Sequence, residues 1–237
     1  MTPLWRKIVA MPLITFEGSE ACGKSTQVKR LAARLEKWGI RPAVLREPGG
    51  TAIGEAIRHL LQHSEDNHAM TPETELLLFE ASRSQLVREK IQPALRRGEW
   101  VICDRFFDST TVYQGAARQL DPGVVEKLNA FAVGDCVPDL TFVLDIDRAT
   151  AQSRLGNRKK IRDRMEEESD EFHERVISRL SRAGRKRTET RHPDRWANLA
   201  RYNREPNLEY ICSTLSRPRK TSDSKDQTSN TLNVFLR

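Results

Sequence analysis

The sequence predicts an α/β fold of three layers, in which a parallel sheet is flanked by helices. Short apolar runs alternate with helical patterns through most of the chain, an order of elements that forms parallel sheets. Ligands bind such sheets at the carboxyl ends of the strands, so we expect a site along that edge. Charged, glycine and proline residues gather there, at Glu17, Gly18, Arg46, Glu47, Pro48, Asp104, Arg105 and Asp145.

The expected elements follow one another along the chain. Strands are expected at 13–16, 43–45, 100–103 and 140–144, and helices at 26–38, 52–62 and 73–97. Pro72 marks the start of the long helix, because a proline at the first helical position loses no hydrogen bond. Pro93 is expected to kink or split that helix, and Gly98 to end it. No later apolar run fits a strand, so we expect a fifth strand to be missing.

Residues 18–25 read Gly-Ser-Glu-Ala-Cys-Gly-Lys-Ser, a complete phosphate-binding loop of the form G-x-x-x-x-G-K-S. Gly18 and Gly23 let backbone N–H groups turn toward a phosphate, and the following helix adds its positive dipole end. Lys24 is expected to reach the β- and γ-phosphates, and Ser25 to offer its hydroxyl to Mg²⁺. A chance glycine-rich turn is the alternative, which the flanking strand and helix disfavour. The residues expected to hold the triphosphate are Gly18, Ser19, Glu20, Ala21, Cys22, Gly23, Lys24, Ser25 and Thr26.

The net charge of +7 lies in the last quarter of the chain. Residues 179–237 carry 14 Lys and Arg against 6 Asp and Glu, whereas residues 1–178 carry 26 against 27. Few aromatic residues are interleaved with this basic tail, so specific nucleic-acid binding is not indicated. No apolar run approaches the roughly 20 residues that span a bilayer. The four cysteines are isolated in sequence, which favours buried thiols in a reducing cytoplasm.

Composition divides the chain into three parts. Residues 1–10 lack the apolar core of a signal peptide and precede Met11, so we interpret them as an N-terminal extension. Residues 11–178 form the expected nucleotide-binding domain. Within it, the charge-dense residues 149–170 are a candidate lid over a transferring phosphoryl group, with a solvated helix face as the alternative. Residues 179–237 form a polar tail that we expect to be disordered.

Further motifs stand in a characteristic order. They are R-E-P-G-G-T from Arg46, L-L-L-F-x-A-x-R from Leu76, D-R-F-x-D-S-T-x-x-Y-Q-G from Asp104, P-D-L-T-F-V-L-D from Pro138, D-R-M-E from Asp163 and F-H-E-R-V from Phe172. With the phosphate-binding loop, they resemble the thymidylate kinase family. The resemblance implies a P-loop NTPase fold, a homodimer, and phosphorylation of dTMP to dTDP with ATP and Mg²⁺. Another nucleoside monophosphate kinase, an inactive P-loop remnant and a basic nucleic-acid binder stay open as alternatives.

The resemblance also implies roles for residues on the acceptor side. Phe79 would stack on thymine and Arg83 would hydrogen-bond it; a helix core residue and an arginine reaching solvent are the alternatives. Arg105 would hold the dTMP phosphate and Asp104 would lie near Mg²⁺, unless the two form a structural ion pair. The acceptor-binding residues implied in this way are Arg46, Glu47, Pro48, Phe79, Arg83, Arg105, Ser109, Thr110, Tyr113 and Gln114.

The resemblance implies that members neutralise the charge of the transferring phosphoryl group in one of two ways. One version has an arginine in the phosphate-binding loop, and the other has arginines in the lid. This chain has Ala21 in the loop and an arginine-rich lid, so it resembles the lid-arginine version common in bacteria. Glu20 matches the acid that orients the sugar or the attacking phosphate. The residues expected to act in catalysis are Glu20, Lys24, Arg105, Arg154, Arg158 and Arg164.

The resemblance stops after Val176. The family continues with a helix, a strand and a last helix, whereas this chain continues with a basic, polar sequence. Read one nucleotide further on, the codons allowed for residues 179–196 can spell GFLALAENEPKRVILIDG, which fits the family at this point. We therefore hypothesise a single-nucleotide frameshift near codons 176–179.

Overall fold

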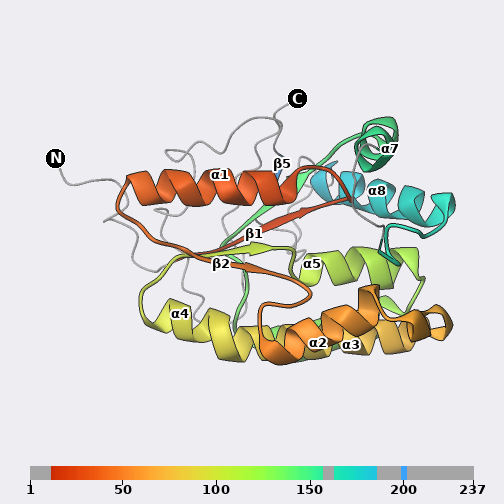
Figure 1. Ribbon diagram of the computed structural model, residues 1–237, viewed down its shortest axis with the longest axis horizontal. Coiled ribbons are helices and arrows are strands. Elements are labelled where there is room, and N and C mark those ends of the chain that lie inside the picture. Colours follow the sequence, from red (N-terminus) through yellow and green to blue (C-terminus); the bar gives the residue numbers. More distant parts are fainter. Residues whose placement is uncertain (1–11, 157–162, 186–198, 202–237) are drawn as a thin grey trace, which may run out of the picture.

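The computed structural model describes residues 12–156, 163–185 and 199–201. A parallel sheet in the order β2-β3-β1-β4-β5 forms the middle layer, so the predicted three-layer α/β fold is confirmed. Helix α1 covers one face of the sheet, and α2, α3 and α4 cover the other (Figure 1). The strands are β1 (Leu13–Gly18), β2 (Ala43–Arg46), β3 (Val101–Asp104), β4 (Leu140–Leu144) and β5 (Leu199–Arg201).

The helices account for the remaining regular structure. On the two faces lie α1 (Lys24–Lys37), α2 (Ala52–Gln62), α3 (Pro72–Leu86) and α4 (Gln92–Arg96). The later helices are α5 (Phe107–Thr110), α6 (Pro122–Val133), α7 (Arg148–Gly156) and α8 (Asp170–Arg185). Three short segments have tighter or wider turns: η2 (Glu65–Ala69), η3 (Val87–Ile91) and η4 (Thr111–Ala117). None of the described helices is both long and apolar enough to cross a membrane.

The core lies on both faces of the central strand β1, all of which is buried. Ile14 and Phe16 pack in one apolar cluster with Leu31 of α1. Leu13 packs in another cluster with Leu86 of α3. Successive side chains of a strand point to opposite faces, so one continuous apolar run fills both layers. The phosphate-binding loop that follows β1 therefore starts from the most enclosed part of the sheet.

The long helix expected at 73–97 is interrupted, as Pro93 predicted. Helix α3 passes into the π-helical turn η3, and α4 then begins with Pro93 in its first turn. Proline lacks an N–H and its ring clashes with the carbonyl group four residues earlier, so a regular α-helix cannot continue through it. Gly98 follows with a left-handed φ of 77° and ends the helical segment.

Two expectations about the carboxyl-terminal part need correction. The fifth strand is not missing, because β5 pairs in parallel with β4, with Thr141 opposite Leu199. The backbone groups of an edge strand can pair with any extended segment, so this pairing does not require an apolar run. In addition, α8 continues to Arg185, so regular structure extends past the domain boundary expected at residue 178. The expected extension at 1–10 lies outside the described residues.

Candidate active site

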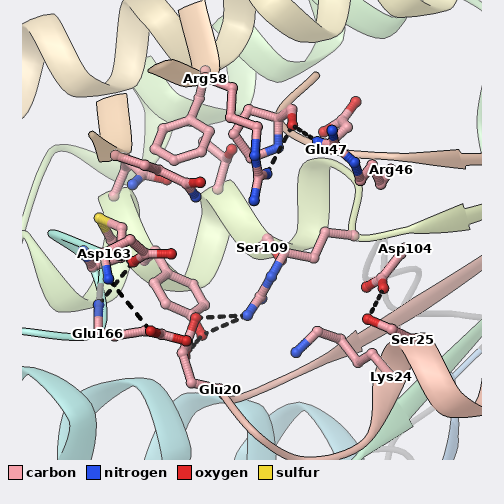
Figure 2. A pocket seen from close by; sticks show the side chains of 18 of the residues that line it. Glu20, Lys24, Ser25, Arg46, Glu47, Arg58, Asp104, Ser109, Asp163 and Glu166 are labelled. Atoms are coloured by element: carbon pink, nitrogen blue, oxygen red, sulfur yellow. Dashed lines mark hydrogen bonds and ion pairs between the residues drawn. The ribbon is translucent and has the colours of Figure 1, made fainter. Parts of the chain in front are cut away.

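A cavity opens at the carboxyl ends of β1, β2 and β3, on the edge where the sequence predicted a site (Figure 2). Its walls come from the phosphate-binding loop, the loop after β2, helix α3, the end of β3 and the segment from α5 to η4. The predicted residues that line this cavity are Glu20, Ala21, Lys24, Ser25, Arg46, Glu47, Pro48, Phe79, Asp104, Arg105, Ser109, Thr110, Tyr113 and Gln114. Predicted donor and acceptor residues thus share one space.

The phosphate-binding loop packs closely against β4. Gly18 has a φ of 147°, and a Cβ atom on it would lie 2.5 Å from the carbonyl oxygen of Leu144. Gly23 has a left-handed φ of 99° and directly precedes α1. The Lys24 Nζ atom donates to the carbonyl oxygens of Gly18 at 3.0 Å and Ser19 at 2.6 Å. The loop therefore has the backbone conformation and the helix N-terminus that a phosphate site requires.

Ser25 and Asp104 connect the start of α1 to the end of β3. The Ser25 hydroxyl donates to Asp104 Oδ2 at 2.6 Å. Hydroxyl and carboxylate oxygens suit Mg²⁺, which usually takes one or two protein ligands and completes its shell with water and phosphate oxygens. Across the described ranges, no group of three or more His, Cys, Asp or Glu residues could hold a metal by itself. The pair fits a metal that arrives with a nucleotide.

Arg105 lies at the centre of a charged cluster. Its φ of 70° is left-handed, a strained conformation for a residue other than glycine. Its guanidinium group donates to Glu20 Oε1 at 2.7 Å and lies 5.1 Å from the centre of the Tyr113 ring. The Tyr113 hydroxyl donates to Glu20 Oε2 at 2.5 Å. Burial alone would raise the pKa of Glu20, but the charges of Arg105 and Lys24 outweigh it and hold the pKa below its usual value.

Glu17 of β1 supports this cluster through hydrogen bonds to the residues that follow Arg105. One carboxylate oxygen accepts from the Phe106 backbone N–H at 2.8 Å, and the other accepts from the Ser109 hydroxyl at 2.5 Å. Burial raises the pKa of Glu17. The side chain therefore fixes the chain just after Arg105, a role that its place at the strand end did not reveal in the sequence.

Arg83 lies behind the cavity wall and does not line the cavity. It is 1% exposed, and it donates to Glu47 at 2.8 Å and to Thr110 at 3.0 Å. Its other nitrogen donates to Glu80 at 2.7 Å and to Asn129 at 3.2 Å. The guanidinium group thus supports two residues of the wall, and its contact with the base stays a prediction.

Glu47 and Pro48 form the wall beside β2. Burial raises the pKa of Glu47 to about 7, against the opposing effect of Arg83. Glu47 Oε1 is buried and, in the described part of the chain, has no hydrogen-bond partner. Arg46 and Arg58 both donate to the Pro48 carbonyl oxygen at 3.0 Å, so two cationic groups border this side of the cavity.

The three predicted lid arginines have different positions. Arg154 of α7 donates to the carbonyl oxygen of Ala21 at 3.3 Å, over the phosphate-binding loop. Arg164 donates to the Leu61 carbonyl oxygen at 3.1 Å and to Glu75, and it does not line the cavity. Arg158 lies outside the described residues.

Sequence reasoning missed part of the lining. Three of the missed residues belong to the D-R-M-E motif, in which only the arginine had been assigned a role. The other two lie on one helix, α2, where no motif marked them. The missed lining residues are Arg58, Gln62, Asp163, Met165 and Glu166.

A phosphate-binding loop after the central strand, cationic side chains that line the same cavity and an arginine over the loop define a P-loop kinase of small phosphorylated substrates. A family model described as thymidylate kinase matches residues 16–192. The chain belongs to the thymidylate kinase family.

Similarity to individual members is high. The thymidylate kinase of Geobacter sulfurreducens is 51% identical over 168 residues, which are 69% of this chain and 78% of the relative. That of Thermomicrobium roseum is 46% identical over 183 residues, 77% of this chain and 83% of the relative. The crystal structure of thymidylate kinase from Ehrlichia chaffeensis is 31% identical, with a TM-score of 0.63, and covers 82% of this chain and 93% of that one.

Proposed function

We infer that this protein transfers the γ-phosphoryl group of ATP to dTMP and produces dTDP. The observation that carries this inference is that Lys24 of the phosphate-binding loop shares one cavity with Arg105, Phe79 and Gln114. A donor triphosphate and an acceptor base can therefore occupy the same space. Membership of the thymidylate kinase family favours this reaction over the other nucleoside monophosphate kinases, and over a remnant without activity.

Catalysis is proposed to come from positioning and charge. An acceptor phosphate oxygen is already a nucleophile, so the reaction needs no strong general base. Arg105, held by Glu20, would bind the acceptor phosphate. Lys24 and Arg154 would neutralise the transferring group, together with Arg158, as the sequence predicted. The position of Arg164 on Glu75 favours a supporting role for it.

Mg²⁺ is proposed to bind beside Ser25 and Asp104. When bound, it would neutralise charge on the β- and γ-phosphates. The Ser25 hydroxyl would be a direct ligand, and Asp104 would orient the ion or its water. Loss of turnover in EDTA, with recovery on adding MgCl₂, would support this proposal, whereas undiminished turnover in EDTA would reject it.

The acceptor pocket is proposed to hold dTMP between two walls. Arg46, Glu47 and Pro48 would flank its phosphate and sugar, and Phe79 would stack on the base. The residues proposed to read the base and exclude a 2′-hydroxyl are Ser109, Thr110, Tyr113 and Gln114. Arg83 would contribute from behind the wall, through its hydrogen bond to Thr110. A loss of dTMP affinity in Phe79→Ala with unchanged ATP affinity is expected, and unchanged dTMP affinity would contradict the stacking.

A homodimer is proposed from exposed apolar side chains on neighbouring helices. Leu77 of α3 and Val124 and Phe131 of α6 are 55%, 50% and 76% exposed, and α3 contacts α6. Apolar surface of this kind is typical of subunit contacts. Sedimentation that finds only monomers at micromolar concentrations would contradict the proposal.

The cellular compartment and the domain limits are also proposals. Cys22, Cys103 and Cys136 are buried free thiols, which favours the reducing cytoplasm. We propose that the catalytic domain comprises residues 11–178 together with the rest of α8, which ends at Arg185, and that residues 149–170 are its lid. Fractionation of cells would locate the protein, and limited proteolysis would map the domain.

Turnover with single monophosphates tests the proposed function. The purified full chain with ATP and MgCl₂ is expected to convert dTMP faster than any other nucleoside monophosphate. Lys24→Ala removes a charge that stabilises the transferring group. Arg105→Lys keeps the charge but loses the planar fork that can hold an acceptor phosphate through two hydrogen bonds. Each variant should lower kcat by about 10²–10³-fold. Lys37→Ala, at the exposed end of the same helix as Lys24, is the control. Absence of dTMP turnover in a folded sample would reject the function.

A further inference from the structure

Glu75 of α3 lies behind the cavity wall formed by Gln114. It is 1% exposed, and its carboxylate accepts four hydrogen bonds. Oε1 accepts from Gln114 Nε2 at 2.7 Å and from Arg118 Nε at 3.1 Å. Oε2 accepts from Arg118 Nη2 at 2.8 Å and from Arg164 Nη2. The proposals above give this carboxylate no role beyond its contact with Arg164.

The charge on Glu75 determines which end of the Gln114 amide it contacts. Burial alone would raise the pKa of Glu75, but hydrogen bonds from Arg118 and Gln114 outweigh burial and hold the pKa below its usual value. An ionised carboxylate can only accept hydrogen bonds. The amide nitrogen of Gln114 must therefore face Glu75, although the two ends of an amide have nearly the same shape.

This orientation has a consequence for the cavity, which Gln114 lines. With its nitrogen engaged by Glu75, the amide has its carbonyl oxygen left for a base. A carbonyl oxygen accepts a hydrogen bond from the N3–H group of thymine or uracil. Cytosine has a bare acceptor nitrogen at N3, so two lone pairs would face each other.

We propose that Glu75 is a positioning residue that sets the base preference of the acceptor site, by holding the Gln114 amide with its carbonyl oxygen toward the base. The proposal rests on the proposed function, since it concerns the base of the acceptor nucleotide. Arg164, from the D-R-M-E motif, and Arg118, which also pairs with Glu168, hold the carboxylate in place. The segment that carries Arg164 and Glu168 thereby contributes to base selection.

The test compares Glu75→Gln with wild type on dTMP and dCMP, with ATP and MgCl₂. A glutamine at this position can donate or accept, so it no longer fixes the Gln114 amide. The ratio of kcat/KM for dTMP to that for dCMP is expected to fall at least tenfold, while the KM for ATP stays unchanged. Glu75→Asp keeps an ionised acceptor and should retain more of the preference. Glu73→Gln, an exposed position on the same helix, should behave as wild type.

The outcomes separate this proposal from the proposed function. If the ratio of kcat/KM for dTMP to that for dCMP is unchanged in Glu75→Gln, even when both values fall, the role of Glu75 is overturned. Absence of dTMP turnover in the wild type would reject the function itself.

A measurement on the wild type covers the case that Glu75→Gln does not fold. In ¹⁵N-labelled protein, the side-chain amide signals of Gln114 are identified by their loss in Gln114→Met. One of these protons is expected downfield of those of exposed Gln152, as a hydrogen bond to a carboxylate requires. Two signals within the range of Gln152 would overturn the proposal.

Discussion

Gly18, the first residue of the phosphate-binding loop, lies directly against the end of β4. Its φ of 147° and the 2.5 Å distance from a Cβ position to the Leu144 carbonyl oxygen leave no room for a side chain. Gly18→Ala is expected to lower the free energy of unfolding by roughly 2–4 kcal/mol, from overpacking and strain together. Urea denaturation measures this.

Gly39→Ala is the matched control for Gly18→Ala. Gly39 also has a positive φ, of 78°, but no atom lies within 4 Å of its Cβ position. Gly39→Ala should lower the free energy of unfolding by only about 1 kcal/mol, which is the effect of backbone strain alone. Equal losses in the two variants would show that close packing at Gly18 contributes nothing.

Glu47 is expected to make stability depend on pH. Its pKa is raised from 4.5 to about 7 in the folded protein, so between these values the folded state binds more protons than the unfolded chain. Stability should therefore fall as pH rises from about 4.5 through 7, and stay lower above.

Glu47→Gln should flatten this profile, because its amide does not titrate. The measurement is the urea midpoint between pH 5 and pH 8 for wild type, Glu47→Gln and the exposed control Glu36→Gln. If Glu47→Gln keeps the wild-type slope, another group titrates in this window.

Residue motifs locate the site, but they do not determine which partner each side chain takes. Arg105 and Glu20 were each expected to act on the acceptor, without a contact between them, and they form an ion pair at 2.7 Å. Arg83 was predicted to contact the base, yet it pairs with Glu47 and Glu80. These partners lie on different elements, so only the packed structure reveals that Arg83 is already hydrogen-bonded to protein acceptors.

At the scale of elements, α8 shows how the first part of the C-terminal region packs on the domain. Phe172, Val176 and Leu180 follow one another at intervals of four, and all three are buried in a cluster with Val112 and Tyr113 of η4. An apolar stripe at this spacing is what anchors a helix to a domain. The helix thereby supports the segment that carries Tyr113 and Gln114.

Leu180→Ala is expected to lower the free energy of unfolding by about 2–4 kcal/mol, because it leaves a cavity in this cluster. Ser178→Ala, on the exposed side of the same helix, should change stability little. A loss below about 0.5 kcal/mol in Leu180→Ala would mean that the chain is not packed at this position.

The two π-helical turns show where prediction of elements fails. Pro93 predicted the interruption at η3, because the steric effect of proline is local and can be recognised in the sequence. No proline lies in η4 or in α5 before it, and Gly115 within η4 does not specify a wider turn by itself. The turn is accompanied by contacts to α8, α6 and α5. Such tertiary contacts are not encoded by local residue patterns, so the turn could not be predicted from the sequence.

At the scale of the whole molecule, the frameshift hypothesis makes a direct prediction. Restoring the shifted frame would place the apolar run VILIDG where the family has its last strand. Burial of that run should raise the free energy of unfolding by more than about 3 kcal/mol and lower the KM for ATP. Calorimetry and kinetics of the restored chain, compared with a version in which the restored residues are scrambled, measure both effects.

The gene itself provides the second test. Codons for residues 179–196 that spell GFLALAENEPKRVILIDG one nucleotide further on would support the frameshift. Codons that spell an unrelated string would reject it, as would a restored chain no more stable than the scrambled one. On the edge of β4 that faces away from β1, only the three residues of β5 pair with it in the described part of the chain, so the expected gain is large.

The carbonyl oxygens of the phosphate-binding loop compete with a bound phosphate for the ammonium group of Lys24. The ammonium group donates to the carbonyl oxygens of Gly18 and Ser19, so a phosphate that engages it replaces existing contacts rather than adding new ones. The net heat of nucleotide binding is then smaller than a count of phosphate contacts suggests. When no phosphate is bound, the same carbonyl oxygens keep the ammonium group hydrogen-bonded.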